Sequence, residues 1–254
     1  MAIHMRIHIH LALAAMLLGS CNIVGTIAER GNGVAVTTAV KVEGFSSISI
    51  PSSIDVVYTL SDEEQSVVFT CDENLLDNYD IHVEGNTLVV DSKPGTILSP
   101  KVRTVLAVSA PVLEGVKVSG SGDCTVHGNI PACDYFCLKS SGSGDISVSG
   151  SVSSVAFSSS VTGSGEISVG SISAKSAEIG ISGSGDITID GITADSIKAR
   201  TTGSGDIWLV CKDAGSIDAS VSGSGSIRLS GTAGSLRSNR TGSGRIYTET
   251  LRTP

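Results

Sequence analysis

Acidic residues recur at one fixed position of a repeated turn sequence, and stacked carboxylates can bind a cation. The residue that follows Gly-Ser-Gly is acidic in five copies, which form the carboxylate column: Asp123, Asp145, Glu166, Asp186 and Asp206. Asp55 occupies the matching position of a weaker copy, and Ser226 and Arg245 end the column. If the copies stack, like charges become neighbours and repel unless something offsets them.

Two arrangements would offset that repulsion. Ca²⁺ prefers oxygen ligands, and these carboxylates with nearby Ser hydroxyls and turn carbonyls could bind it between copies. Alternatively, each carboxylate accepts hydrogen bonds from the backbone of its own glycine-rich turn, as Asp next to Gly commonly does. The second arrangement needs no cofactor. Ca²⁺ is the only cofactor that the sequence suggests, and the glycines lack the strand, helix and Lys context of a phosphate loop.

A regular repeat must position this column. Gly-Ser-Gly recurs with spacings of 22, 21, 20, 20, 20 and 19 residues, starting at Gly120, Gly142, Gly163, Gly183, Gly203, Gly223 and Gly242. Apolar residues between the copies fall in columns separated by even numbers of residues, which is strand periodicity. A copy of about 20 residues leaves no room for an ordinary helix and predicts one coil of a β-solenoid.

Stacked coils would place equivalent side chains ~4.8 Å apart. The position four residues after the first Gly then forms an aliphatic core column, as Ile146, Ile167 and Ile187 illustrate. One outward column alternates in charge from coil to coil, and it contains Glu178, Lys198, Asp218 and Arg237. Opposite charges are favourable between neighbouring strands, so this column is interpreted as a solvated structural face.

The segment before Gly120 begins with the same unit. Residues 45–55 align without gaps on residues 113–123, which predicts a degenerate first coil. Between these two segments the sequence predicts a β excursion that covers the open end of the solenoid. Its expected elements are strands at 66–71, 80–83, 87–91 and 103–109, a turn or short helix at 72–78, and a hairpin turn at Gly85-Asn86.

The amino terminus has the features of an export signal. Residues 1–20 contain a basic residue and a short apolar run, which is too short to span a bilayer in the mature protein. The sequence Leu-Gly-Ser-Cys that ends at Cys21 resembles a bacterial lipobox, which implies cleavage before Cys21 and lipidation of its sulfur and amine. The alternative is a secretory signal with a chance cysteine. Acyl chains would anchor the protein stably to a membrane.

These features predict one folded domain. Residues 21–43 show little apolar periodicity and are expected to form a tether after the lipidated Cys21. A single β-helix domain is expected over 44–254, in which 44–118 form the degenerate coil and cap and 119–254 form the repeats.

Composition excludes several function classes. The formal net charge of −8 disfavours nucleic acid as a partner. Aromatic residues make up 4% of the chain, which argues against stacking platforms for bases or sugars.

Parallel β-helices often act on pectin-like polymers, so a polysaccharide lyase or hydrolase is the alternative function. A hydrolase needs a special carboxylate pair, whereas this column is uniform. A lyase needs a base, but Lys139 and Arg200 of one outward column are separated by Ser160 and Gly180. A non-enzymatic role is therefore predicted.

The remaining reactive residues form no clear site. His82 and His127 lie at unrelated positions and are interpreted as ordinary strand or surface residues. Cys124 falls in an Ile column and is expected to be a buried thiol. Five cysteines follow Cys21, so they cannot all pair internally, and their pairing stays open: Cys71, Cys124, Cys133, Cys137 and Cys211.

Three features together resemble a known family. They are Gly-Phe-x-x-Ile at 44–48, Cys-Asp-Glu-Asn-Leu-Leu at 71–76, and the Gly-Ser-Gly-Asp repeats. The chain resembles the head GIN domain family of putative auto-transporter adhesins, common among secreted and lipid-anchored proteins of Bacteroidetes. The resemblance covers about 44 to 250 and implies a right-handed parallel β-helix, with no established catalytic residues.

The resulting hypothesis is a lipid-anchored, non-enzymatic adhesin or scaffold of the cell envelope, placed at the outer membrane. Its expected partners are the membrane, through the anchor, and glycans or other envelope proteins. The sequence leaves the ligand, the membrane face and the oligomeric state open.

Overall fold

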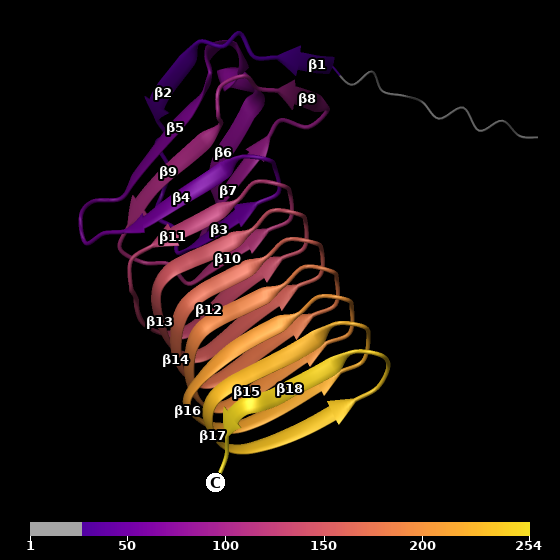
Figure 1. Ribbon diagram of the computed structural model, residues 1–254. Coiled ribbons are helices and arrows are strands. Elements are labelled where there is room, and N and C mark those ends of the chain that lie inside the picture. Colours follow the sequence, from indigo (N-terminus) through magenta and orange to yellow (C-terminus); the bar gives the residue numbers. More distant parts are fainter. Residues whose placement is uncertain (1–26) are drawn as a thin grey trace, which may run out of the picture.

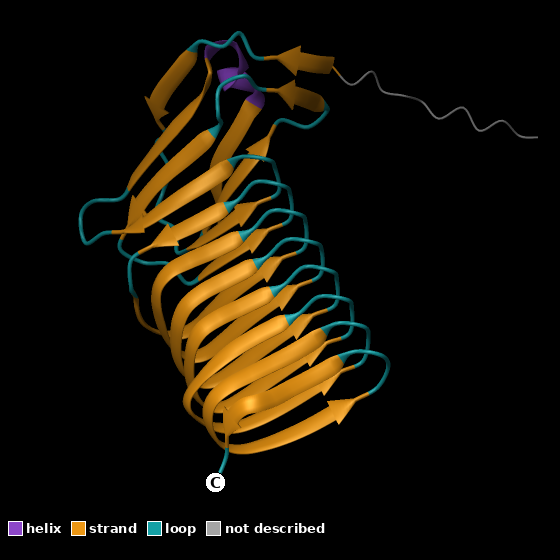
Figure 2. Ribbon diagram, viewed as in Figure 1, coloured by secondary structure: helices purple, strands orange, loops and turns teal. Residues whose placement is uncertain are grey.

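Parallel pairing of successive coils builds the repeated segment. The computed structural model describes residues 27–254, and it confirms an all-β solenoid of about seven turns whose equivalent positions lie about 20 residues apart. The central strands each wrap around most of one coil: β13 (Ile146–Val161), β14 (Ile167–Ile181), β15 (Ile187–Thr201), β16 (Ile207–Val221) and β17 (Ser226–Arg240). Figure 2 shows the connecting turns stacked along one edge of the solenoid.

The observed register confirms the sequence columns. Strand β11 (Cys124–His127) pairs with β13 so that Cys124 faces Ile146, and Ile146 faces Ile167 in β14. These three side chains are buried, which confirms the buried thiol predicted for Cys124. Glu178, Lys198, Asp218 and Arg237 also follow one another in register, as predicted for the outward charged column.

The stacked turns require glycine because the coils approach very closely there. A Cβ added to Gly183 would lie 2.1 Å from the carbonyl oxygen of Gly163 in the preceding coil. Backbone bonds link these turns, with the N–H of Ser184 donating to that same oxygen at 3.0 Å. Close approach therefore selects glycine at Gly183, where φ does not lie in the left-handed region.

The degenerate first coil is present in the register that the sequence predicts. Strand β3 (Ser47–Ile50) pairs with β10 (Gly115–Val118), and β4 (Asp55–Leu60) pairs with β11. The second part of the next coil is β12 (Ile130–Ser140), which pairs with β10 and β13.

The predicted β excursion covers the amino-terminal end of the solenoid (Figure 1). The excursion comprises β5 (Ser66–Asp72), a 3-10 helix (Glu73–Asn78), β6 (Tyr79–Glu84), β7 (Thr87–Ser92), β8 (Thr96–Ser99) and β9 (Val105–Ala110). Strands β6 and β7 form the expected hairpin around Gly85, and β5 runs antiparallel to β9.

The tether expected over 21–43 is wrong for residues 27–39, which form two strands. Strand β1 (Ile27–Arg30) pairs with β8, and β2 (Ala35–Ala39) pairs antiparallel with β5. The segment lacks apolar periodicity because β2 is an edge strand whose residues are exposed or half-buried. The predicted signal at 1–20 and Cys21 lie outside the described residues.

A buried carboxylate fixes this amino-terminal segment to the cap. Asp72 accepts hydrogen bonds from the backbone N–H groups of Gly33, Lys101 and Val102 at 2.6, 2.8 and 2.9 Å. Burial alone would raise the pKa of Asp72, but these donors and the nearby Lys101 charge lower it. The ionised carboxylate therefore joins two loops that are distant in sequence.

No helix within residues 27–254 is long and apolar enough to cross a membrane. The carboxyl-terminal strand β18 (Arg245–Arg252) pairs with β17 and ends the large sheet.

Replacing Gly183 by Ala tests the stacked-turn constraint. We expect Gly183→Ala to lower the free energy of unfolding by about 1–3 kcal/mol, because its Cβ would overlap the carbonyl of Gly163. Gly180→Ala is the matched control, since an added Cβ there meets nothing within 4 Å. The control should change stability by less than about 1 kcal/mol in urea unfolding. Equal losses in the two variants would contradict the explanation.

Candidate functional site: the carboxylate column and the outer groove

The carboxylate column is a hydrogen-bonded ladder between coils. The Oδ1 atom of Asp123 accepts the backbone N–H of Asp145 at 2.9 Å, and Asp145 accepts that of Glu166 at 2.7 Å. Asp186 accepts the N–H of Asp206 at 2.7 Å in the same way. The structure thus brings all five predicted residues into one column, where most of them bridge to the equivalent residue of the next coil.

This pattern differs from the turn-capping alternative considered for the sequence. The backbone donor belongs to the following coil, whereas the sequence argument placed it in the carboxylate's own turn. Each N–H donor partly neutralises the charge of the carboxylate in the preceding coil, and this offsets the expected repulsion along the column. Glu166, whose side chain is one methylene longer than that of Asp, is the exception. Among the described residues its carboxylate accepts no bond from the backbone N–H of Asp186.

Arginines neutralise the two ends of the ladder. Asp55 at the amino-terminal end accepts bonds from Nε and Nη2 of Arg103 at 3.1 and 3.0 Å. At the other end, Asp206 accepts the backbone N–H and hydroxyl of Ser226 at 2.7 and 2.8 Å, and Nη1 of Arg228 at 2.9 Å. Ser226 thus replaces the sixth carboxylate without breaking the ladder.

The contacts at Asp206 also shift its ionisation. Partial burial raises the pKa of Asp206, but hydrogen bonds from Arg228 and Ser226 and the Arg228 charge lower it overall. The ionised form therefore adds stability above the unfolded-state pKa, which is about 3.9. That contribution is lost as the pH falls through the lowered pKa of the folded protein.

The ladder leaves limited capacity for a metal ion. Within residues 27–254, no three His, Cys, Asp or Glu side chains gather closely enough to hold one. Ca²⁺ binding between coils remains a prediction, and it would have to use the carboxylate oxygens that face solvent.

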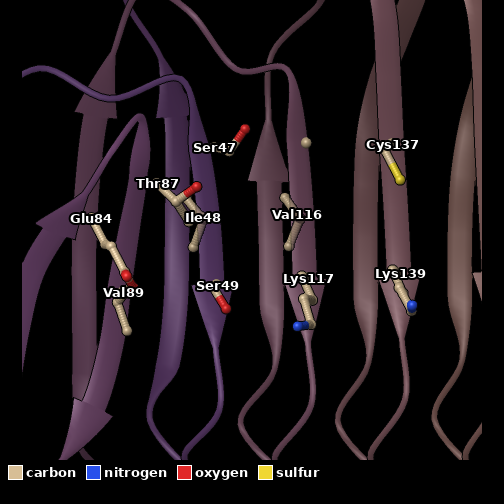
Figure 3. Close-up of a pocket in the computed structure, with 11 residues that line it drawn as sticks. Ser47, Ile48, Ser49, Glu84, Thr87, Val89, Val116, Lys117, Cys137 and Lys139 are labelled. Atoms are coloured by element: carbon tan, nitrogen blue, oxygen red, sulfur yellow. The ribbon is translucent and has the colours of Figure 1, made fainter.

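The outward face beside the first coils is hollowed by a groove (Figure 3). A cavity of about 480 Å³ spans β6, β7, β3, β10 and β12, and its polar lining includes Ser49, Glu84, Thr87, Lys117 and Lys139. Gly115 lies between Ser47 and Cys137 in register, so no side chain fills the floor at that point. We call this cavity the outer groove.

Two exposed lysines stand side by side in the outer groove. Lys117 of β10 faces Lys139 of β12 in register, and Figure 3 shows both side chains along the same stretch of the groove. Like charges directly opposite each other are unfavourable, and neither lysine forms an ion pair among the described residues. A ligand with an acidic group would relieve this repulsion.

Lys117 was missed in the sequence, although a signal existed. It stands three residues before Gly120, as Lys139 stands three residues before Gly142. The expected separation of Lys139 from Arg200 is observed, because Ser160 and Gly180 occupy the rungs between them.

The other reactive residues remain dispersed. His82 lies 3.2 Å from Asp80, and Nδ1 of His127 lies 3.2 Å from the hydroxyl of Ser149. The five cysteines of the described segment are free thiols: Cys71, Cys124, Cys133, Cys137 and Cys211. Burial raises the pKa of Cys124 to about 12, so this thiol stays protonated at neutral pH.

Together these features define a β-solenoid whose polar surface residues are arranged in columns. The chain belongs to the family described as putative auto-transporter adhesin, head GIN domain, whose model matches residues 44–233 and 173–254. The family that the sequence resembles is therefore confirmed. No curated protein matches the chain.

Solved structures share the fold. A putative adhesin from Bacteroides fragilis is 22% identical with a TM-score of 0.77, over 86% of this chain and 99% of that one. A putative adhesin from Parabacteroides distasonis is 24% identical with a TM-score of 0.72, over 87% and 99%. A protein of P. distasonis described as a putative lipid binding protein is 25% identical with a TM-score of 0.68, over 87% and 98%.

Substitutions at Asp186 test whether the ladder is held by hydrogen bonds or by a cation. Asp186→Ala removes the acceptor for the N–H of Asp206 and should cost about 1 kcal/mol of unfolding free energy. Asp186→Asn keeps an acceptor oxygen and should retain most of that stability. Glu166→Ala is the control, because Glu166 lacks the equivalent bond. If the Asn and Ala variants lose the same stability, and only in the presence of Ca²⁺, the hydrogen-bond explanation fails.

Proposed function

We propose that this protein is a lipid-anchored, non-enzymatic adhesin or scaffold of the bacterial envelope. Membership of the head GIN family supports an adhesive role at the cell surface or envelope. The observation that carries the proposal is the use of the carboxylate column: most of its side chains accept backbone N–H groups of the next coil. The repeated acidic residues thus maintain a rigid polar rod, and they do not converge as catalytic groups do.

The anchor would hold the cap end of the rod at the membrane. Cys21 precedes the start of β1 by six residues, and an extended chain of that length reaches at most ~20 Å. Strand β1 lies at the cap end of the solenoid (Figure 1). Lipidation of Cys21 at the outer membrane would therefore place the cap beside the bilayer and leave the coils free to contact a partner.

The outer groove is the proposed contact site for that partner. Its two adjacent lysines and several hydroxyls suit a glycan that carries acidic groups, because ammonium and hydroxyl groups can donate to carboxylate or sulfate oxygens. Its openness to solvent suits a polymer that lies across the strands.

The alternative function is a polysaccharide lyase or hydrolase. The pairing of Lys117 with Lys139 favours the lyase, because it places two amines that could serve as the base side by side in the outer groove. Incubation with polygalacturonate distinguishes the two functions. A lyase releases products with a new carbon–carbon double bond that absorbs in the ultraviolet, and a hydrolase releases new reducing ends, whereas an adhesin releases neither.

Cys21→Ala tests the anchor. The wild-type chain, expressed in a Bacteroidetes host, should partition with outer-membrane vesicles and carry a lipid mass at its amino terminus. The variant should appear in the soluble fraction, because it lacks the acceptor sulfur. Cys211→Ala is the control, because it removes a different cysteine, which is a free thiol. Equal membrane association of wild type and Cys21→Ala would contradict lipid anchoring.

The double variant Lys117→Gln, Lys139→Gln tests the outer groove. Binding to a glycan array should fall about tenfold or more for acidic glycans, as expected from the loss of two charge-assisted contacts. The matched control is Lys175→Gln, Lys212→Gln, which removes the same charge from exposed positions elsewhere. Unchanged binding in the groove variant, or the same loss in the control, would exclude the groove as the site.

A further inference from the structure

Charge is distributed unequally along the rod. Residues 226–254 contain one acidic side chain, Glu249, and five arginines: Arg228, Arg237, Arg240, Arg245 and Arg252. Residues 27–118 contain 13 acidic side chains and only six basic ones. The cap and the carboxyl terminus lie at opposite ends of the solenoid (Figure 1). A protein of net charge −8 therefore ends in a basic surface, which we call the arginine end.

The arginine end arises where the repeat changes. Arg245 occupies the position of the carboxylate column, so the sign of that column is reversed in the last coil. Arg240 occupies the column that is aliphatic or Ser/Thr in the earlier coils. Both side chains are exposed and flank the final Gly-Ser-Gly turn. These replacements flank the turn into β18, the strand at the edge of the large sheet among the described residues.

The terminal guanidinium of Arg240 is held over this turn. Its Nη1 donates to the carbonyl oxygen of Gly244 at 3.3 Å. The hydroxyl of Thr201 makes the equivalent bond to Gly205 at 3.1 Å in an earlier coil. Arg240 thus replaces a neutral donor by a charged one, and the remaining N–H groups of its guanidinium are available to an anion.

An arginine between two aromatic rings lies on the adjacent outward column. The guanidinium carbon of Arg228 is 5.4 Å from the ring centre of Trp208 and 4.8 Å from that of Tyr247. Its Nη1 also donates to Asp206 at 2.9 Å, so the group is fixed on several sides. The same column contains small hydroxyl residues in the three preceding coils: Ser147, Ser168 and Thr188.

A shallow cavity of about 420 Å³ adjoins this stack. Trp208, Val210, Arg228, Tyr247 and Glu249 contribute to its lining. The cavity combines half-buried aromatic rings, a fixed cation and a carboxylate that can accept hydroxyl hydrogen bonds. Such a combination suits a sugar, whose apolar ring faces pack on aromatics while its hydroxyl and acidic groups bind the polar side chains.

We infer that the arginine end is a binding site for acidic polysaccharide, with sulfate or carboxylate groups bound by arginine and a sugar ring packed beside Trp208 and Tyr247. The site deepens the proposed function by adding a second contact surface for the same class of ligand. Arginine suits this role because its planar guanidinium binds such anions through two parallel hydrogen bonds.

The position of the site matches the anchored orientation, which rests on the proposed function. An anchor at Cys21 would hold the cap near its own membrane, so the arginine end would point outward. The acidic cap would repel a polyanion, while the arginine end would attract it. The charge distribution therefore directs an acidic polymer to the arginine end. A second copy anchored in the same membrane would have its acidic cap at the bilayer and out of reach of this end.

The experiment measures binding of the purified chain to immobilised dextran sulfate, with neutral dextran as the reference polymer. The variant Arg240→Gln, Arg245→Gln should bind about tenfold or more weakly at low ionic strength, because two guanidinium contacts are lost. The control variant Lys175→Gln, Arg200→Gln removes the same charge from exposed positions of the middle coils and should bind like the wild type. Thermal unfolding of each variant verifies that the fold is retained.

A second pair of substitutions tests the aromatic stack without a change in charge. Trp208→Thr and Tyr247→Ser give the column the residue types of earlier coils, so the coils should still stack. We expect a several-fold loss of dextran sulfate binding, and polygalacturonate binding should fall in parallel.

Three outcomes would overturn the inference. The first is that the wild type binds neither dextran sulfate nor polygalacturonate. The second is that the arginine variant and its control lose equal binding affinity. The third is salt-sensitive self-association that Arg240→Gln, Arg245→Gln abolishes. The last outcome would assign the arginine end to the acidic cap of a second copy. The first outcome would also count against the outer groove, whereas the other two leave the groove variant unaffected. None of the three affects the lipid-anchor test, so failure of the arginine end is distinguishable from failure of the proposed function.

Discussion

The solenoid depends on the spacing of parallel strands, because each coil hydrogen-bonds in register to the next. At about 4.8 Å per coil, a residue's closest neighbours are its equivalents in the coils on either side. An apolar position therefore becomes a continuous core column, as the run through Ile146, Ile167 and Ile187 shows. The same spacing requires glycine at two positions of each stacked Gly-Ser-Gly turn, since the backbone of the neighbouring turn occupies the space that a Cβ would need.

The same constraint explains how a column of negative charges can exist. Stacking would normally bring the carboxylates into repulsion, but it also brings a backbone N–H of the next coil within 2.7 to 2.9 Å of Asp123, Asp145 and Asp186. Each side chain is consequently both a charge and an acceptor in the link between coils. The Asp side chain has the right length to reach this N–H, whereas Glu166 makes no such bond. Arg103 and Arg228 neutralise the carboxylates at the two ends of the ladder.

A rod of stacked coils has two open ends, and this protein completes them differently. The amino-terminal end is covered by the excursion, which Asp72 joins to the segment before the first coil. Within residues 27–254 no excursion covers the carboxyl-terminal end, and exposed arginines occupy positions there that are acidic or uncharged in the inner coils. Charge on an exposed edge also disfavours uncontrolled pairing with other strands. The two ends therefore differ in both chemistry and accessibility.

The amino-acid sequence by itself determined the solenoid, its period, its core columns and the register of the degenerate first coil. This was possible because in-register stacking turns a position in the repeat directly into a position in space. Tertiary structure alone decided that the carboxylates bond to the next coil, since a repeat pattern does not state which backbone group a side chain reaches. It also decided that residues 27–39 are strands, because their partners are distant in sequence and carry no periodic signal. The stack of Trp208, Arg228 and Tyr247 was hidden for a related reason: a low overall aromatic content says nothing about whether the few rings present meet on one column.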